Sequence, residues 1–220
     1  MAEVAFSTLD VEEENAIEVF YNIETAKIDY FHIDVMDGEF VQRNNVLQMK
    51  DYALKINSIS MTSKEVHLMV RNPMEFVDYF IDNGADRIIF HIETCDNNEE
   101  ALKVVNYLKE NGVKVGIAIN PDTEIERVYE LLHNIHEVLV MSVVPGKGGQ
   151  AYLESTNEKI KKLKKYCDEN NIDIDIEVDG GINEKTGLEA VQAGANILVS
   201  GNYVLNSDDY KDAINNLKNI

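Results

Sequence analysis

The sequence has little cysteine and no long apolar stretch, and each shortage excludes a class of protein. The two cysteines, Cys95 and Cys167, are too few for a disulfide framework. No apolar run reaches the roughly 18 residues that a membrane-spanning helix needs, and the first residues carry no basic segment of the kind that opens a signal peptide. We therefore expect a cytoplasmic protein with reduced thiols that does not enter a membrane.

Positive charge is also scarce, because 20 lysines and arginines face 40 aspartates and glutamates, which gives a formal net charge of −20. Nucleic acids and anionic membranes are bound by clustered Lys and Arg, so we expect neither as a partner. Such a surface also repels phosphorylated substrates at long range. A phosphate site in this chain therefore has to be built locally, from backbone amides.

Short β-branched runs alternate with amphipathic stretches along the whole chain. Eight such pairs in 220 residues give about 27 residues per unit, which predicts one (β/α)8 TIM barrel over residues 1–220, a single domain. A doubly wound sheet with fewer strands is the alternative, but no GxGxxG follows the first strand. The expected strands are Val4–Ser7, Ile28–Asp34, Glu65–Leu68, Arg87–His91, Lys114–Ala118, Glu137–Met141, Asp173–Asp179 and Ile197–Ser200, and helices are expected, for example, over Asn98–Asn111 and Leu153–Asn170.

Histidine and aspartate side chains stand at the ends of three of these strands. His32 and Asp34 are two residues apart and so face one side of their strand, while His67 and Asp179 end the third and seventh strands. Barrel enzymes collect their catalytic residues at this end of the strands. Any one of them alone is more often a satisfied buried polar group, but four that converge on one rim favour a functional site.

Two imidazoles and two carboxylates are a plausible ligand set for one divalent metal: zinc, iron(II), manganese or cobalt. Such an ion can bind two oxygens of an α-hydroxyketone and stabilise the charge that develops when a carbon-bound proton leaves. Asp34 and Asp179 can then act as base and acid on opposite faces of that carbon, which inverts it through an enediolate. A purely structural metal site is the plainer alternative.

Methionines and glycines occur at matching rim positions. Met36, Met69 and Met141 can line a dry pocket with polarisable thioethers, although a single methionine is more often core filler. Glycines follow the last three strands, where barrels commonly bind phosphate and where glycine lets amides approach an anion, although glycines in loops are usually turn formers. The phosphate candidates are Gly146, Gly148, Gly149, Gly180, Gly181, Gly201 and the neighbouring Asn202.

Several further residues have weaker signals. His91 and Glu93 are expected just behind the metal ligands, and Glu177 is expected to orient a histidine ligand. The lysine-rich run 159–165 reads as a solvated helix face. Thr123 with Glu126 is the pattern of a capping box that opens a helix.

Taken together, these motifs are similar to those of the ribulose-phosphate 3-epimerase family. The likeness covers nearly the whole chain, through FHIDVMDGEFV, VHLMVRNP, VLVMSVVPGKGGQ, VDGGI and AGANILVSGN. It implies a metal-dependent barrel that interconverts D-ribulose 5-phosphate and D-xylulose 5-phosphate, with Asp34 as base and Asp179 as acid. It further implies that Ser7 contacts substrate, and family members are often dimers or hexamers, so a homo-oligomer is expected.

The departures from the family pattern cluster around the substrate. The segment 39–45 differs, Lys147 stands in the glycine-rich loop, and Asn202 replaces the usual serine after Gly201. A longer sugar such as allulose 6-phosphate is therefore a second candidate substrate, and a sensor that binds sugar phosphates without catalysis is a candidate of another class. A decarboxylase-type barrel is disfavoured because Asp34 is followed by Val35 and Met36 and not by a lysine two residues on.

Overall fold

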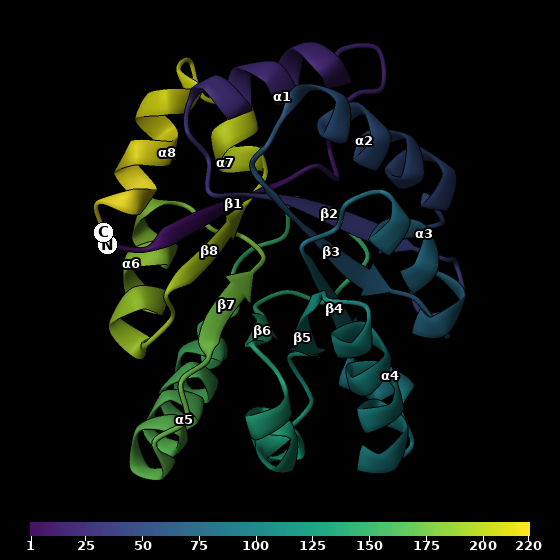
Figure 1. Ribbon diagram of the computed structural model, residues 1–220. Coiled ribbons are helices and arrows are strands. Elements are labelled where there is room, and N and C mark those ends of the chain that lie inside the picture. The colour runs from purple at the N-terminus through teal and green to yellow at the C-terminus, as the bar shows by residue number, and fades with distance from the viewer.

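The computed structural model describes residues 1–220 and has a closed barrel of eight parallel strands in sequence order (Figure 1). Each strand pairs with the next, and β1 pairs with β8 to close the ring. The (β/α)8 barrel is thus confirmed, and the open doubly wound sheet is excluded. The strands are β1 Glu3–Ser7, β2 Tyr30–Met36, β3 Ser63–Met69, β4 Arg87–His91, β5 Lys114–Ile119, β6 Glu137–Met141, β7 Asp175–Asp179 and β8 Ile197–Ser200.

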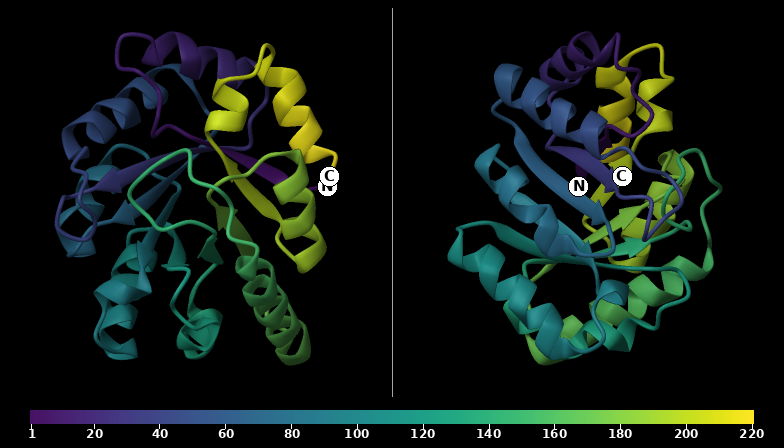
Figure 2. Two further views of the ribbon diagram at one scale, coloured as in Figure 1. Left: turned by 180° about the vertical axis from the view of Figure 1, so that it is seen from behind. Right: turned by 90° about the vertical axis from the view of Figure 1, so that its right-hand side faces the viewer.

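Helices surround the barrel in every view (Figure 2). No helix is both long and apolar enough to cross a membrane. The α-helices are α1 Ala16–Thr25, α2 Val46–Ile59, α3 Val77–Asp82, α4 Asn98–Glu110, α5 Ser155–Asn170, α6 Glu184–Ala193, α7 Asn202–Leu205 and α8 Tyr210–Lys218, and the 3-10 helices are η1 Pro73–Glu75, η2 Ile92–Thr94 and η3 Ile125–Asn134.

Two separate cores follow from the alternation of side chains along the strands. The large core of 54 buried residues lies between strands and helices, where Phe31 of β2 packs edge-on against Phe20 of α1 at 5.9 Å between ring centroids. The inner core has only eight buried apolar residues. Much of the barrel interior is therefore filled by polar side chains. Gly116 makes room for them, because a Cβ there would lie 2.8 Å from Ile89 and 3.3 Å from Glu137 Oε1.

Two strands run further than the sequence indicates. β2 pairs with β3 over seven residues, up to Met36 beside Met69, and Asn45 Oδ1 accepts the Met36 amide at 2.8 Å. Asp34 and His67 thus lie two residues before their strand ends, and not at the ends. This register leaves the two methionines as the rim, directly above the polar residues.

The expected capping box is wrong. Thr123 turns its hydroxyl to Glu93, and η3 begins after Glu124 without a side-chain cap. Glu93 offers a partly buried carboxylate that competes for the Thr123 hydroxyl, a contact between distant segments that no local pattern reports.

Candidate active site

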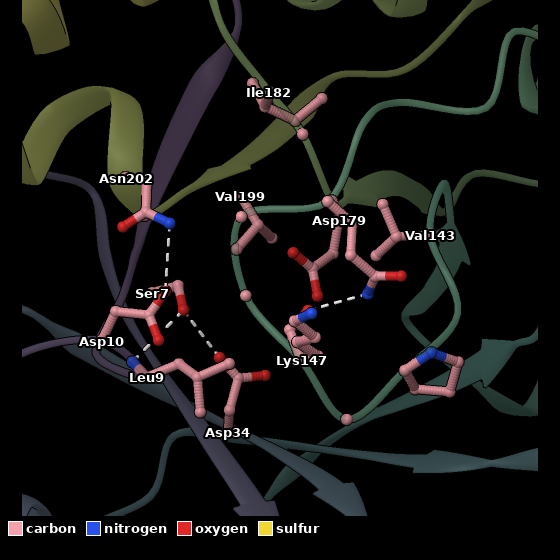
Figure 3. A pocket seen from close by; sticks show the side chains of 18 of the residues that line it. Ser7, Leu9, Asp10, Asp34, Val143, Lys147, Asp179, Ile182, Val199 and Asn202 are labelled. Atoms are coloured by element: carbon pink, nitrogen blue, oxygen red, sulfur yellow. Dashed lines mark hydrogen bonds between the residues drawn. The ribbon is translucent and has the colours of Figure 1, made fainter.

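One pocket opens at the carboxyl ends of the strands, and its lining is drawn in Figure 3. Asp34 enters it from β2 and Asp179 from β7. His32 and His67 are fully buried immediately behind it. The lining includes every residue that the sequence nominated for substrate: Ser7, Met36, Met69, Met141, Gly146, Gly148, Gly149, Gly180, Gly181, Gly201 and Asn202.

The four nominated metal ligands come together in space. One donor atom from each of His32, Asp34, His67 and Asp179 lies within 4.8 Å of all the others. Asp34 Oδ1 is 3.0 Å from His67 Nδ1 and 3.3 Å from His32 Nε2, and Asp179 Oδ2 is 3.9 Å from His67 Nδ1. Nitrogen and oxygen donors at this spacing can surround one divalent cation.

The far side of each histidine is held by a further side chain. His32 Nδ1 is 2.8 Å from Glu65 Oε1, and His67 Nε2 is 2.9 Å from His91 Nε2. Such partners fix the tautomer of a metal-binding imidazole and its ring orientation. Glu177, which was expected to orient a histidine, has its Oε1 3.7 Å from His32 Nδ1 and makes no hydrogen bond to it.

His91 is held in turn, and one partner of the cluster was missed by sequence reasoning. His91 Nδ1 is 3.1 Å from Glu93 Oε2, so both residues lie behind His67 where they were expected. Glu65 was overlooked, although it stands two residues before His67 and therefore faces the same side of β3.

Burial and neighbouring charges separate the acidities of the two aspartates. Burial alone would raise the pKa of Asp34, but the His32 charge and hydrogen bonds from both histidines lower it well below its usual range. Burial and the charge of Asp34 raise the pKa of Asp179 to about 7. At neutral pH one carboxyl is therefore ionised while the other is half protonated.

The two histidines differ in the same way. Burial lowers the pKa of His67 to about 4, so its ring is neutral and free to bind a cation. Burial acts in the same direction on His32, but the charge of Asp34 and the nearby carboxylates outweigh it and raise the pKa of His32 well above its usual value. A proton on His32 therefore competes with a metal for the same ring nitrogen.

The wall of the pocket combines one hydroxyl with thioethers. Ser7 Oγ donates to Asp34 Oδ2 at 2.7 Å (Figure 3). The other oxygen, Oδ1, faces the two histidines. Met36 and Met69 are buried together with Leu9, and Met141 packs in the inner core. These apolar groups exclude water from the reacting end of the pocket.

Glycines of the loops after β6, β7 and β8 also line the pocket. Five glycine amides lie outside the helices and strands and donate no hydrogen bond within the protein: those of Gly148, Gly149, Gly180, Gly181 and Gly201. Gly180 has φ of +120°, and a Cβ there would lie 2.4 Å from Val143. Donors of this kind, brought close by glycine, suit an anion such as phosphate.

Sequence comparisons point to one family. The model of the Ribulose-phosphate 3 epimerase family matches residues 3–205. A ribulose-phosphate 3-epimerase of Methanocaldococcus jannaschii is 37% identical over 99% of this chain and 90% of the relative. A ribulose-phosphate 3-epimerase of Bacillus subtilis is 35% identical over 90% of this chain and 89% of the relative.

Solved structures with the same fold are much more distant in sequence. A 3-hexulose-6-phosphate synthase superposes with a TM-score of 0.68 at 15% identity, covering 100% of this chain and 99% of that one. A thiamine phosphate pyrophosphorylase from Pyrococcus furiosus gives a TM-score of 0.67 at 13% identity, covering 99% and 94%. At such identities the likeness supports the barrel alone.

Proposed function

The chain belongs to the ribulose-phosphate 3-epimerase family, and within that family we propose that it inverts C3 of D-ribulose 5-phosphate through Asp34 and Asp179. It is an epimerase, an isomerase of carbohydrate metabolism. The observation that carries the proposal is the gathering of two carboxylates and two imidazoles, with donor atoms within 4.8 Å of one another, in one pocket. We further propose that residues 1–220 are one catalytic domain.

The residues fit a divalent cation held by His32, Asp34, His67 and Asp179. Two carboxylates lie in a buried cluster that contains no lysine or arginine, and the neutral imidazole of His67 is a good ligand. When bound, such a cation supplies positive charge that offsets the negative charge developing on the substrate oxygens. Zinc, iron(II), manganese and cobalt all suit this donor set, and the choice among them stays a prediction.

The difference in acidity supports opposite roles for the two aspartates. Asp34 is ionised at neutral pH and is the base that takes the C3 proton, while Asp179, whose pKa in the metal-free protein is about 7, is the group that delivers a proton to the other face. Ser7 fixes the Asp34 carboxylate by its hydrogen bond. In the reverse direction the two aspartates exchange roles.

The methionines and glycines hold the two ends of the substrate. Met36, Met69 and Met141 contact the reacting carbons and keep water out. The amides at Gly148, Gly149, Gly180, Gly181 and Gly201 bind the phosphate, helped by Asn202. The long-range repulsion from a net charge of −20 makes this local grip necessary.

Two other assignments stay open to test. Lys147 lines the pocket and adds a cation to its glycine-rich loop, which favours a longer sugar such as allulose 6-phosphate as the second candidate substrate. Buried free thiols at Cys95 and Cys167 support a reducing compartment such as the cytoplasm. The expected dimer or hexamer stays a prediction.

Deuterium incorporation followed by NMR tests the function directly. The protein is incubated in heavy water with manganese, iron(II) or zinc, and with ribulose 5-phosphate and allulose 6-phosphate in parallel. We expect deuterium at C3 together with the epimer, faster on the pentulose. The Asp34→Asn variant should lose about 10²-fold or more of this rate, the usual weight of a general base.

The matched control is Asp122→Asn, which removes an exposed carboxylate in the loop after β5, outside this pocket. Its rate should equal that of the unchanged protein. Unaltered exchange in Asp34→Asn would refute the base assignment. No exchange on either sugar, with metal bound, would leave a non-catalytic sugar-phosphate sensor.

A further inference from the structure

The amides of the pocket glycines together with Asn202 form the proposed phosphate site, called here the phosphate grip. A carboxylate already lies among these hydrogen-bond donors. Asp10, in the loop after β1, lines the pocket, and its Oδ2 accepts from Asn202 Nδ2 at 3.0 Å (Figure 3). The same oxygen touches Gly148 so closely that a Cβ at that position would lie 2.1 Å from it. Asp10 therefore takes up hydrogen-bonding capacity and space at the end of the pocket where we place the phosphate.

Asp10 has no counter-ion within the pocket lining itself. Three carboxylates line it, and two of them, Asp34 and Asp179, belong to the histidine cluster. Lys147 is the one cationic residue in the lining, and Asp10 has no ion pair with it. The nearest guanidinium is that of Arg43, whose Nη1 is 3.9 Å from Asp10 Oδ1.

Arg43 is placed to receive this carboxylate. Its Nη2 donates to the Leu9 carbonyl at 3.4 Å, which holds the guanidinium beside the loop that carries Asp10. The Asp10 side chain is 35% exposed, so a rotation toward Arg43 breaks only its bond to Asn202. A closer contact with Arg43 would replace that bond with a charge-assisted one.

We propose that Asp10 is an internal anion that occupies the phosphate grip of the free protein and is displaced toward Arg43 when a sugar phosphate enters. The proposal rests on the proposed function, because it takes the glycine amides and Asn202 as the phosphate site. Carboxylate and phosphate compete for the same donor and repel each other across a short distance. Asp10 thus sets how tightly phosphorylated ligands bind.

The test measures binding of inorganic phosphate by calorimetry and the KM for ribulose 5-phosphate, in the metal-loaded protein. Asp10→Asn keeps the shape of the side chain and an oxygen for Asn202 but removes the charge. We expect the Kd of phosphate and the KM both to fall about tenfold, the effect of relieving one like-charge contact at a partly solvated site. The change should appear in KM and not in kcat.

A second variant, Arg43→Met, tests whether Arg43 receives the displaced carboxylate. In the unchanged background it should raise both constants severalfold, because the displaced carboxylate loses its partner. In the Asp10→Asn background the same replacement should have little effect, so the two changes are coupled. Glu12→Gln, an exposed charge two residues along the same loop, is the control and should leave both constants unchanged.

Each failure has a distinct signature. An unchanged or weaker phosphate Kd in both Asp10→Asn and Asp10→Ser overturns the proposal, and so does phosphate binding to neither the unchanged protein nor the variants. Asp10→Ser provides an independent variant if the asparagine side chain itself blocks the grip. Epimerisation without any effect of Asp10 refutes this inference alone. A tighter phosphate site in a protein that fails to epimerise refutes the proposed function and leaves this inference standing.

Discussion

The mouth and the floor of the barrel interior both crowd buried carboxylates together, but they balance the charge in different ways. At the floor, Arg87 is 2% exposed and contacts Glu137, with Asp175 at 3.0 Å and Glu65 at 3.6 Å. At the mouth, Asp34 and Asp179 have histidines and no permanently charged cation. The floor is therefore balanced by the protein itself, while the mouth has a donor set that can hold a cation from outside.

The pKa values of the ionisable groups differ between floor and mouth in the same way. Burial alone would lower the pKa of Arg87, but the charges of Glu137 and Glu65 raise it, so the guanidinium stays charged. Glu177, next to His32, is kept neutral, because burial and the neighbouring carboxylates raise its pKa well above the usual value. The protein thus limits the net charge at the floor. The ionised Asp34, although buried, lines the pocket above it.

The largest expected effect is the loss of stability when the cation at the floor, Arg87, is removed. Arg87→Met leaves the buried carboxylates of Glu65 and Glu137 without a cation, and removal of one partner from a buried ion pair typically costs about 3–5 kcal/mol of unfolding free energy. Chemical denaturation with and without saturating divalent metal measures this loss. We expect metal not to restore it, because the proposed cation site lies at the mouth.

The matched control is Lys161→Met, which removes an exposed lysine from its ion pair with Glu158. Surface pairs contribute at most about 1 kcal/mol, so little change is expected. Full recovery of Arg87→Met by metal would contradict the comparison, since the floor would then also accept an external cation.

A smaller expected effect is the pH dependence of stability, to which the mouth and the floor contribute through different groups. In the folded, metal-free protein the pKa values of Asp179 and Glu137 are both about 7, raised chiefly by burial. Between pH 6.5 and 8 the folded state then binds more protons than the unfolded one, so stability falls as pH rises. His32, with its raised pKa, acts in the same direction, whereas His67, neutral in the folded state but still partly protonated in the unfolded chain near pH 6.5, opposes the loss weakly.

Thermal denaturation at several pH values measures this loss, which we expect to reach about 1–2 kcal/mol across the window. Saturating metal should reduce the slope, because a bound cation keeps Asp179 ionised while Glu137 at the floor still titrates. Asp179→Asn should give the same reduced slope without metal. A stability that rises between pH 6.5 and 8 would be the contrary result.

Much of the fold and of the pocket lining was predictable because both follow from periodicity. Alternation along the strands places His32, Asp34 and His67 on the inner side, and barrel topology brings β2, β3 and β7 to one mouth. The prediction failed where distant contacts decide, as at Thr123. It also failed for Lys159, which was expected on a solvated helix face but donates to the carbonyls of Asn120, Pro121 and Thr123.

The floor was largely outside the reach of sequence reasoning. Arg87 and Glu137 read as ordinary charged residues at strand starts, and only the closed ring shows that they meet across the barrel. Asp10 was also missed, because its neighbours Gly148 and Asn202 are more than 130 residues away along the chain. Asp175, by contrast, shares the inward parity of Asp179, and it contacts Arg87 at 3.0 Å.

The most direct test is calorimetric titration of manganese into the metal-free protein at neutral pH, with one variant from each region. We expect one manganese ion to bind per chain in the unchanged protein and in Glu137→Gln. In Asp34→Asn we expect the affinity for manganese to be at least about 100-fold lower, a larger loss than removing an outer partner of a metal ligand usually causes. Equal binding by Asp34→Asn, or loss of binding in Glu137→Gln alone, would contradict the assignment of the metal to the mouth.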